Sequence, residues 1–189
     1  MNSQNLPAPP ARWLDKHLDL VAAASRAGPV LDLACGLGRN ALYLASKGVP
    51  VVAMDRNPEQ LRGLSQAATA LAKQGPLAPL WPVRCDLETT TGVPARAESV
   101  GAVLVFRFLF RPLAPAIEHV LKPGGIVVYE TFAKAHMATG RGPRREAFYL
   151  APDELPALFP GLEVVAFEEG PDGGAPGDIT SRLVARKPA

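Results

Sequence analysis

Residues 30–41 read VLDLACGLGRNA, and this stretch decides the fold class. It begins with a short apolar run, which is typical of a strand buried on both faces of a sheet. Gly36 and Gly38 follow, and because they lack a Cβ the backbone can turn tightly and approach a ligand. The helix expected next offers unpaired N–H groups and a positive dipole end. The stretch therefore predicts a buried strand, a ligand-binding turn and a helix.

The same alternation continues on both sides of this stretch. Helices are expected at residues 11–27, 39–47, 57–74, 113–121 and 152–159, and strands at residues 30–34, 49–54, 79–84, 100–106, 126–131, 162–168 and 179–186. Asn57 is the expected N-cap of its helix, Gly48 the residue that ends another, and Pro82 weakens the third strand. The pattern predicts an α/β fold: a doubly wound, Rossmann-like sheet of about seven strands, mostly parallel, with an antiparallel C-terminal edge hairpin.

Length, charge and cysteine content limit the function classes. The 189 residues suit one domain, expected over residues 11–189 after a flexible tail at residues 1–10. With 20 Lys and Arg against 18 Asp and Glu the net charge is +2, and no basic run suggests a nucleic-acid partner. Cys35 and Cys85 form no metal-binding pattern, so we expect no metal. We find no signal peptide or membrane-spanning stretch and expect a cytoplasmic protein with no membrane partner.

The glycine turn alone permits more than one nucleotide cofactor. Gly36, Gly38 and Ala41 also match the dinucleotide-binding pattern, and Asp55 follows the second expected strand as the acidic residue of that pattern does. An NAD-linked oxidoreductase is therefore one alternative. Asp32 argues against it, because a carboxylate at the end of the first strand suits a cationic amine and repels a pyrophosphate.

Four segments resemble, in order, the signature segments of class I S-adenosylmethionine-dependent methyltransferases: DLACGLG at 32–38, Asp55, CDL at 85–87 and LKPGG at 121–125. The resemblance implies S-adenosylmethionine as cofactor, with Asp32 and the glycines at its methionine part and Asp55 at its ribose hydroxyls. By the same resemblance, Asp86 and Leu87 flank the adenine. Ala34 departs from the family, which more often has glycine there. The complete set expected to bind the cofactor is Asp32, Ala34, Gly36, Gly38, Asn40, Asp55, Arg56, Asp86, Leu87 and Phe106.

A longer string is similar to the tellurite-resistance methyltransferase family. CGLGRNALYLA at residues 35–45 carries that resemblance, and RLVARK at residues 182–187 is similar more weakly. In that family a His-Arg pair near the C-terminal strands is associated with activity. The chain has no such pair after Leu150, so this part of the resemblance does not transfer.

The acceptor of the methyl group should bind beyond the carboxyl ends of the strands. The stretch FRFLF at residues 106–110 lacks the Asn/Asp-Pro-Pro-aromatic motif of enzymes that methylate exocyclic or amide nitrogens. Residues 133–149 look like an inserted lid or substrate segment, with a solvated loop as the alternative. Arg107 and Arg144 are the candidate catalytic residues, within an expected cationic rim formed by Arg107, Arg111, Arg141, Arg144 and Arg145. The sequence thus predicts in-line methyl transfer to a small, anionic molecule.

Each candidate also has a purely structural interpretation. The glycines could form only a tight turn, Asp55 could cap the turn before Asn57, and Asp86 could form a turn after its strand. Arg107 could extend from an apolar strand end into solvent. Because no general base is evident, a non-catalytic module that binds S-adenosylmethionine is a further alternative.

Overall fold

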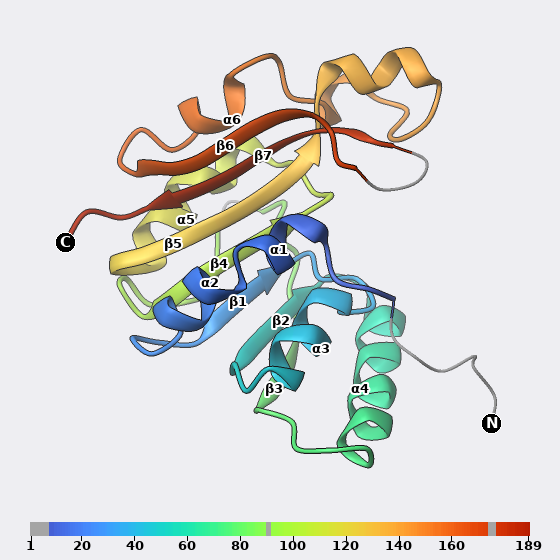
Figure 1. Cartoon of the computed structure of the whole chain (residues 1–189), viewed down its shortest axis with the longest axis vertical. Coiled ribbons are helices and arrows are strands. Elements are labelled where there is room, and N and C mark those ends of the chain that lie inside the picture. The colour runs from blue at the N-terminus through green and yellow to red at the C-terminus, as the bar shows by residue number, and fades with distance from the viewer. Residues whose placement is uncertain (1–7, 90–91, 174–176) are drawn as a thin grey trace.

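The structure is a computed structural model that describes residues 8–89, 92–173 and 177–189. Within these residues one seven-stranded sheet runs in the order β3-β2-β1-β4-β5-β7-β6 (Figure 1). The strands are β1 (Val30–Leu33), β2 (Val51–Asp55), β3 (Leu80–Arg84), β4 (Val100–Phe106), β5 (Leu121–Phe132), β6 (Glu163–Pro171) and β7 (Ile179–Arg186). Neighbours from β3 to β5 are parallel, whereas β7 is antiparallel to both β5 and β6. The predicted sheet with its antiparallel edge hairpin is confirmed.

Helices cover both faces of this sheet. They are α1 (Arg12–Lys16), α2 (Leu18–Ala24), α3 (Arg39–Ser46), α4 (Pro58–Ala72), α5 (Ala114–Val120) and α6 (Glu154–Ala157), with 3₁₀ turns η1 (Arg111–Leu113), η2 (Lys134–Thr139) and η3 (Glu146–Phe148). Buried side chains of α1 to α4 pack on one face of the sheet, and those of α5 and α6 pack on the other. The two cores make β1 and β4, at the centre, the best-protected strands.

The central strand β4 shows how the two cores are built. All seven of its residues are buried, and Leu104 packs toward α1–α4 while its neighbour Val105 packs toward α5 and α6. Gly101 permits the close approach of α2, because a Cβ there would lie 2.1 Å from the carbonyl oxygen of Ala24. The start of β4 therefore lies directly against the end of α2.

Local signals in the sequence predicted several element ends correctly. The side chain of Asn57 accepts a hydrogen bond from the backbone N–H of Glu59 at 2.9 Å, so it caps α4 as expected. Gly48 adopts a left-handed φ of 81° after α3, as a residue ending a helix does. These interactions lie within a few residues of each other in the chain, which is why the sequence alone reveals them.

One predicted helix differs from the structure, and two segments with a weaker sequence pattern take a defined form. The single helix expected at residues 11–27 is two helices, because His17 leaves the helical conformation with φ −114° and ψ 20°. Pro82 stays inside β3, since β3 is an edge strand with β2 as its one neighbour. The segment at residues 133–149, expected without regular structure, contains η2 and η3 and lies at the carboxyl end of β5 (Figure 1).

Candidate functional site

The loop after β1 is shaped by residues with positive φ. Ala34, Gly36 and Gly38 have φ values of 54°, 57° and 75°. At Gly38 a Cβ would lie 2.4 Å from Cδ1 of Leu64 on α4, so glycine is required by both backbone and space. The loop leaves a cavity of about 570 Å³, here called the glycine-loop cavity, which Ala34, Gly36 and Gly38 line together with Asp32. A ligand can therefore reach the backbone of this loop.

Asp32 is the most unusual group in the glycine-loop cavity. Its side chain is 2% exposed, and its Oδ2 has no hydrogen-bond partner within the described residues. Burial raises the pKa of Asp32 to about 7, against a smaller opposing effect of the backbone hydrogen bond from Ala41. A buried carboxylate with an unpaired oxygen is costly, and a cationic group in the cavity would satisfy it.

Asp55 stands at the end of β2 and faces a second cavity of about 260 Å³, the strand-end cavity. Its Oδ2 accepts a hydrogen bond from the N–H of Gly36 and its Oδ1 one from the N–H of Asn57, both at 2.8 Å. The carboxylate thus stabilises the turn, as its structural interpretation requires. Each oxygen keeps a second lone pair, so the same side chain can also accept hydrogen bonds from vicinal hydroxyls.

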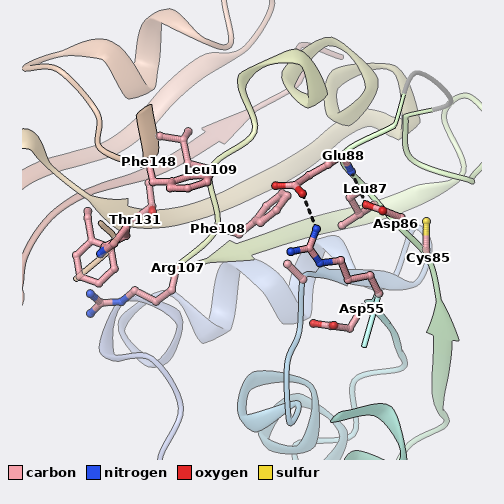
Figure 2. A pocket seen from close by; sticks show the side chains of 14 residues that line it. Asp55, Cys85, Asp86, Leu87, Glu88, Arg107, Phe108, Leu109, Thr131 and Phe148 are labelled. Atoms are coloured by element: carbon pink, nitrogen blue, oxygen red, sulfur yellow. Dashed lines mark hydrogen bonds and ion pairs between the residues drawn. The ribbon is translucent and has the colours of Figure 1, made fainter. Parts of the chain in front are cut away.

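Asp86 and Leu87 follow β3 at the same end of the strand-end cavity. Leu87 is buried, whereas Asp86 is exposed and its Oδ1 accepts a hydrogen bond from the N–H of Glu88 at 3.0 Å. Arg56 forms an ion pair with Glu88 at 2.6 Å, which joins the turns after β2 and β3 (Figure 2). Adjacent parallel strands thus bring all these groups into one cavity wall.

The other end of the strand-end cavity is mostly apolar. Its wall comes from the segment after β4, from the end of β5 and from residues 143–148: Arg107, Phe108, Leu109, Thr131, Phe132, Pro143 and Phe148. Figure 2 shows Thr131 and Phe148 across the cavity from Asp55 and Asp86, with Phe108 between the two groups. The cavity therefore has a polar end on β2–β3 and an aromatic end on β4–β5.

Arg107 lines the strand-end and glycine-loop cavities, but its charge is already balanced. Its guanidinium lies 2.9 Å from carboxylate oxygens of both Asp172 and Asp178 and 3.2 Å from Glu130, and it stacks over the ring of Phe132 at 4.6 Å. Burial raises the pKa of Glu130, and the charge of Arg107 opposes that shift. Arg107 is 24% exposed, so it does not extend freely into solvent.

The remaining arginines do not gather into one rim. Arg111 binds Glu154 and donates to the carbonyl oxygen of Tyr149 at 2.9 Å, so it ties the segment before α6 to the end of β4. Arg141 lies 4.0 Å from Asp178. Arg144 is exposed and lines neither of these cavities. The expected rim is thus divided between ion pairs and the surface.

His136 is a buried group that the sequence analysis missed. It is 0% exposed, stacks on Phe132 with ring centroids 4.7 Å apart, and its Nδ1 accepts a hydrogen bond from the N–H of Ile179 at 3.1 Å. Its Nε2 lies 3.6 Å from Asp178. A histidine in a segment that is otherwise polar gave no signal of burial, because its contacts come from β5 and β7.

A third cavity of about 360 Å³, the N-terminal cavity, adjoins the glycine-loop cavity at Arg39, Arg107 and Asp178. The chain before α1 covers it, and this cover is fixed by Asn40, whose buried Oδ1 accepts a hydrogen bond from the N–H of Ala11 at 2.9 Å. Asn40 and Phe106 also line the glycine-loop cavity. All ten residues expected at the cofactor therefore border the strand-end or glycine-loop cavity.

Two further classes of feature are absent from the residues that the structure describes. No group of three or more His, Cys, Asp or Glu side chains is arranged to hold a metal ion. No helix there is long and apolar enough to cross a membrane.

Burial raises the pKa of the Cys35 thiol, which favours the uncharged, unreactive form.

A sequence model described as "Methyltransferase domain" matches residues 30–125, just over half of the chain. The match contains the glycine loop, Asp55 and Asp86, so it covers the polar end of the strand-end cavity. It ends at Gly125, before the aromatic end is complete.

Two curated relatives are similar in sequence. The probable S-adenosyl-L-methionine-dependent methyltransferase TehB of Haemophilus influenzae is 28% identical over 157 residues, or 81% of this chain. The uncharacterized methyltransferase YodH of Bacillus subtilis is 32% identical over 111 residues, or 57% of this chain. The chain spans about half the length of these relatives, 53% of TehB and 44% of YodH.

Solved structures share the fold. The magnesium protoporphyrin IX methyltransferase of Synechocystis PCC 6803, with bound S-adenosylhomocysteine (SAH), has a TM-score of 0.70 and 14% sequence identity. The alignment covers 94% of this chain and 82% of that one. At this identity the likeness establishes the arrangement of strands and helices, whereas the function must be argued from the site.

Proposed function

Because the chain belongs to the methyltransferase domain family, we propose that it transfers a methyl group from S-adenosylmethionine to a small, anionic molecule by in-line displacement. S-adenosylmethionine is the cofactor of its relative TehB and of the class I methyltransferase group to which the chain belongs. Family membership does not specify three parts of this proposal: the methyl acceptor, the roles of single residues and the geometry of the displacement.

One observation carries the cofactor assignment. Asp32, with a buried and unpaired oxygen, and Asp55, held by two backbone N–H groups, face separate cavities that share Ala34, Arg107 and Phe132 as walls. A ligand with a cationic amine at one end and vicinal hydroxyls further along fits this pair of carboxylates. This arrangement supports binding of the methionine part near Asp32 and of the ribose at Asp55.

The remaining cofactor residues surround these two carboxylates. Leu87 supplies an apolar surface and Asp86 an acceptor for an adenine at the polar end of the strand-end cavity. Arg56, tied to Glu88, borders the same end. Asn40 and Phe106 line the glycine-loop cavity, so they face the methionine part in this proposal. S-adenosylmethionine, when bound, supplies a methyl group activated on a sulfonium sulfur.

The aromatic end of the strand-end cavity is the proposed acceptor site. Within the described residues its wall contains no carboxylate and no imidazole, so no general base lies there to remove a proton. A nucleophile that is already deprotonated near neutral pH needs none, and Arg107 is the charged residue at this end. Both points support a soft, anionic acceptor such as a thiolate or another chalcogen anion, which also agrees with the resemblance of residues 35–45 to the tellurite-resistance methyltransferase family.

Arg107 and Arg144 differ in how directly they can contact the acceptor. Arg107 borders the acceptor site and, held by Asp172 and Asp178, is oriented before an acceptor binds. For Arg144 the proposal requires that residues 133–149 close as a lid, since its side chain lines none of the three cavities. In both cases the arginine binds and orients the anion. The aromatic wall excludes water, and alignment then provides the rate enhancement.

The test is release of SAH from a panel of anionic, neutral and cationic acceptors at low and moderate salt. We expect anionic acceptors to react fastest and their advantage to shrink as salt increases, because the exposed Arg144 attracts them electrostatically, whereas Arg107 orients them although it is already paired with acids. A preference for neutral or cationic acceptors would overturn the anionic acceptor. Thermal stabilisation by NADH and none by SAH would overturn the cofactor assignment and favour the oxidoreductase alternative.

A further inference from the structure

Three phenylalanines line the aromatic end of the strand-end cavity, and their rings differ in what they contact. The ring of Phe132 stacks on His136 with centroids 4.7 Å apart and lies 4.6 Å from the guanidinium of Arg107. The rings of Phe108 and Phe148 stack on no other ring and contact no cation among the described residues. Both are half-buried, so each leaves apolar surface open to the cavity. Aromatic surface without a partner in the fold is suited to an aromatic ligand.

Phe108 and Phe148 come from different segments, and each segment is anchored without a ligand (Figure 2). The carbonyl oxygen of Phe108 accepts a hydrogen bond from the hydroxyl of Tyr129 at 3.0 Å. Phe148 is the last residue of η3, and the next residue, Tyr149, is buried and donates a hydrogen bond to the carbonyl oxygen of Pro143 at 2.7 Å. The two rings are therefore parts of a wall that exists before an acceptor binds, which lowers the entropic cost of binding.

The charge at this end of the cavity gives a compact anion little to bind. The guanidinium of Arg107 lies 2.9 Å from carboxylate oxygens of both Asp172 and Asp178, so its positive charge is balanced. A compact anion would exchange its hydration shell for apolar side chains and for a guanidinium that already has partners, which is unfavourable. An anion attached to an aromatic ring also buries apolar surface, and this burial favours its binding.

We propose that the methyl acceptor is an aryl thiolate, whose ring lies against Phe108 and Phe148 and whose sulfur receives the methyl group. This inference rests on the proposed function and specifies the chemical class of its acceptor. The described wall at this end contains no carboxylate and no imidazole, so the nucleophile must arrive already ionised. An aryl thiol is largely ionised at neutral pH, whereas a phenol, like the side chain of tyrosine, has a pKa of about 10.

The transfer to an aryl thiolate is balanced without a proton acceptor. A lone pair of the thiolate sulfur forms a bond to the methyl carbon while the bond between that carbon and the sulfonium sulfur breaks. The electron pair of the broken bond stays on the departing sulfur, so the products are an aryl methyl sulfide and SAH. Phe108 and Phe148 fix the plane of the acceptor ring and thereby the direction of its sulfur, which is the alignment that the displacement requires.

The experiment measures kcat/KM for SAH release by the full chain with thiophenol, 2,2,2-trifluoroethanethiol and hydrosulfide. All three nucleophiles are sulfur anions, and only thiophenol carries a ring. Each value is expressed per concentration of the ionised form and divided by the rate constant of the uncatalysed reaction, so that ionisation and intrinsic reactivity do not enter the comparison. We expect thiophenolate to exceed both other acceptors by at least about tenfold, because only its ring is buried between the two phenylalanines.

Phe108→Leu and Phe148→Leu each keep an apolar side chain and remove the ring. In each variant we expect the preference for thiophenolate over trifluoroethanethiolate to fall about three- to tenfold, mainly through KM, and SAH affinity to stay within about twofold. Phe167→Leu is the matched control, because Phe167 is a half-buried phenylalanine of β6 that does not line the strand-end cavity. This control should leave the preference unchanged. Circular dichroism and thermal unfolding establish that each variant is folded.

The outcomes separate this inference from the proposed function. A parent chain that prefers hydrosulfide or trifluoroethanethiolate, or that treats the three anions alike, would overturn the aryl acceptor while leaving an anionic acceptor intact. An equal loss toward all three acceptors in Phe108→Leu and Phe148→Leu would also overturn it, since the rings would then only support the surrounding structure. Failure of the unmodified chain to bind SAH would overturn the proposed function, and this inference with it.

Discussion

The two sides of the site are built differently. On the β1–β3 side the candidate acids stand at or just after the ends of their own strands. Asp55 and Asp86 are fixed there by backbone N–H groups, as Asp86 is by that of Glu88 two residues later. On the β4–β7 side, Arg107 is held by Asp172 and Asp178, which are 65 and 71 residues away in the chain. His136 likewise depends on Ile179, 43 residues away. The first side is a set of strand-end turns, and the second is a network of side chains from distant segments.

This difference separates the features that the chain shares with its family from those that are its own. The β1–β3 side lies wholly within the region that matches the family model, which extends on to β4 and the start of β5. Its geometry follows from parallel strands that end at one edge. The β4–β7 side contains the aromatic wall and the acid-bound arginine, which suit it to selecting an acceptor. Substitutions on the first side should therefore affect cofactor binding, and those on the second should affect the acceptor.

The largest effect is expected from Gly36→Val. The residue has φ 57° and a Cβ would lie 2.8 Å from Oε1 of Gln60, so a branched side chain both strains the loop and enters the glycine-loop cavity. SAH affinity measured by calorimetry should fall by more than about 100-fold, or roughly 3 kcal/mol. Gly124→Val is the matched control, because Gly124 has φ 77° with nothing within 4 Å. Normal SAH binding by a folded Gly36→Val variant would show that the loop is not the site.

Asp32→Asn should have opposite effects on the stability of the protein and on its affinity for SAH. Folding raises the pKa of Asp32 to about 7, so the folded protein holds a proton that the unfolded chain releases near pH 4. The free energy of unfolding of the ligand-free parent should therefore fall as the pH rises from about 4 to about 7. The Asn variant has no ionisable group at this position, so its free energy of unfolding should not show that fall. At pH 8 the variant should be more stable by about 2–3 kcal/mol in urea unfolding, yet bind SAH more weakly. A variant less stable than the parent at pH 8 would contradict the unpaired carboxylate.

Asp55→Ala should weaken SAH binding by about 1–3 kcal/mol, or roughly 10- to 100-fold, because two ribose hydroxyls lose a charged acceptor. Part of the loss comes from the freed N–H groups of Gly36 and Asn57. Asp19→Ala, an exposed acid on α2, is the control for the change in charge. Unchanged calorimetric affinity would leave Asp55 with its turn-stabilising role alone.

The smallest effect, and the one that tests the independence of the two sides, is expected from Phe148→Ala. Phe148 reaches the acceptor end from η3, so its loss should raise the KM for the acceptor about three- to tenfold through lost apolar contact. SAH affinity should stay within about twofold. Met137→Ala, in the same 133–149 segment but 40% exposed, is the control. A similar loss of SAH affinity would mean that the two sides do not act separately.

The sequence was a good guide to the fold wherever one strand or one turn carries its own signal. The seven strands, the cap at Asn57 and the positive φ at Gly48 all rest on short-range patterns. The prediction of one helix at residues 11–27 was wrong because its apolar period continues through His17, where the backbone leaves the helical conformation. Propensity is a weak guide when packing on the sheet decides the direction of a segment.

The charges around Arg107 show which part of the site could not be predicted from the sequence. From the sequence, few acids lie near Arg107 and the arginines after it, which suggested an open cationic rim. The antiparallel pairing of β6 and β7 brings the hairpin acids Asp172 and Asp178 onto its guanidinium. No spacing rule reveals such a pair, because the hairpin connection must first reach the end of β4.

Sequence patterns alone are enough to predict the doubly wound sheet, the glycine loop after β1 and the acids at the ends of β1, β2 and β3. These features depend on periodicity, on positive φ and on the shared direction of parallel strands. Which charges remain unpaired depends instead on the folded arrangement of the chain. It leaves Oδ2 of Asp32 and the guanidinium of Arg39 without hydrogen-bond or ion-pair partners in the part of the chain described, and it neutralises Arg107. Ion pairing is set by distances of a few ångströms between segments far apart in the chain, and such distances exist only after the chain has folded.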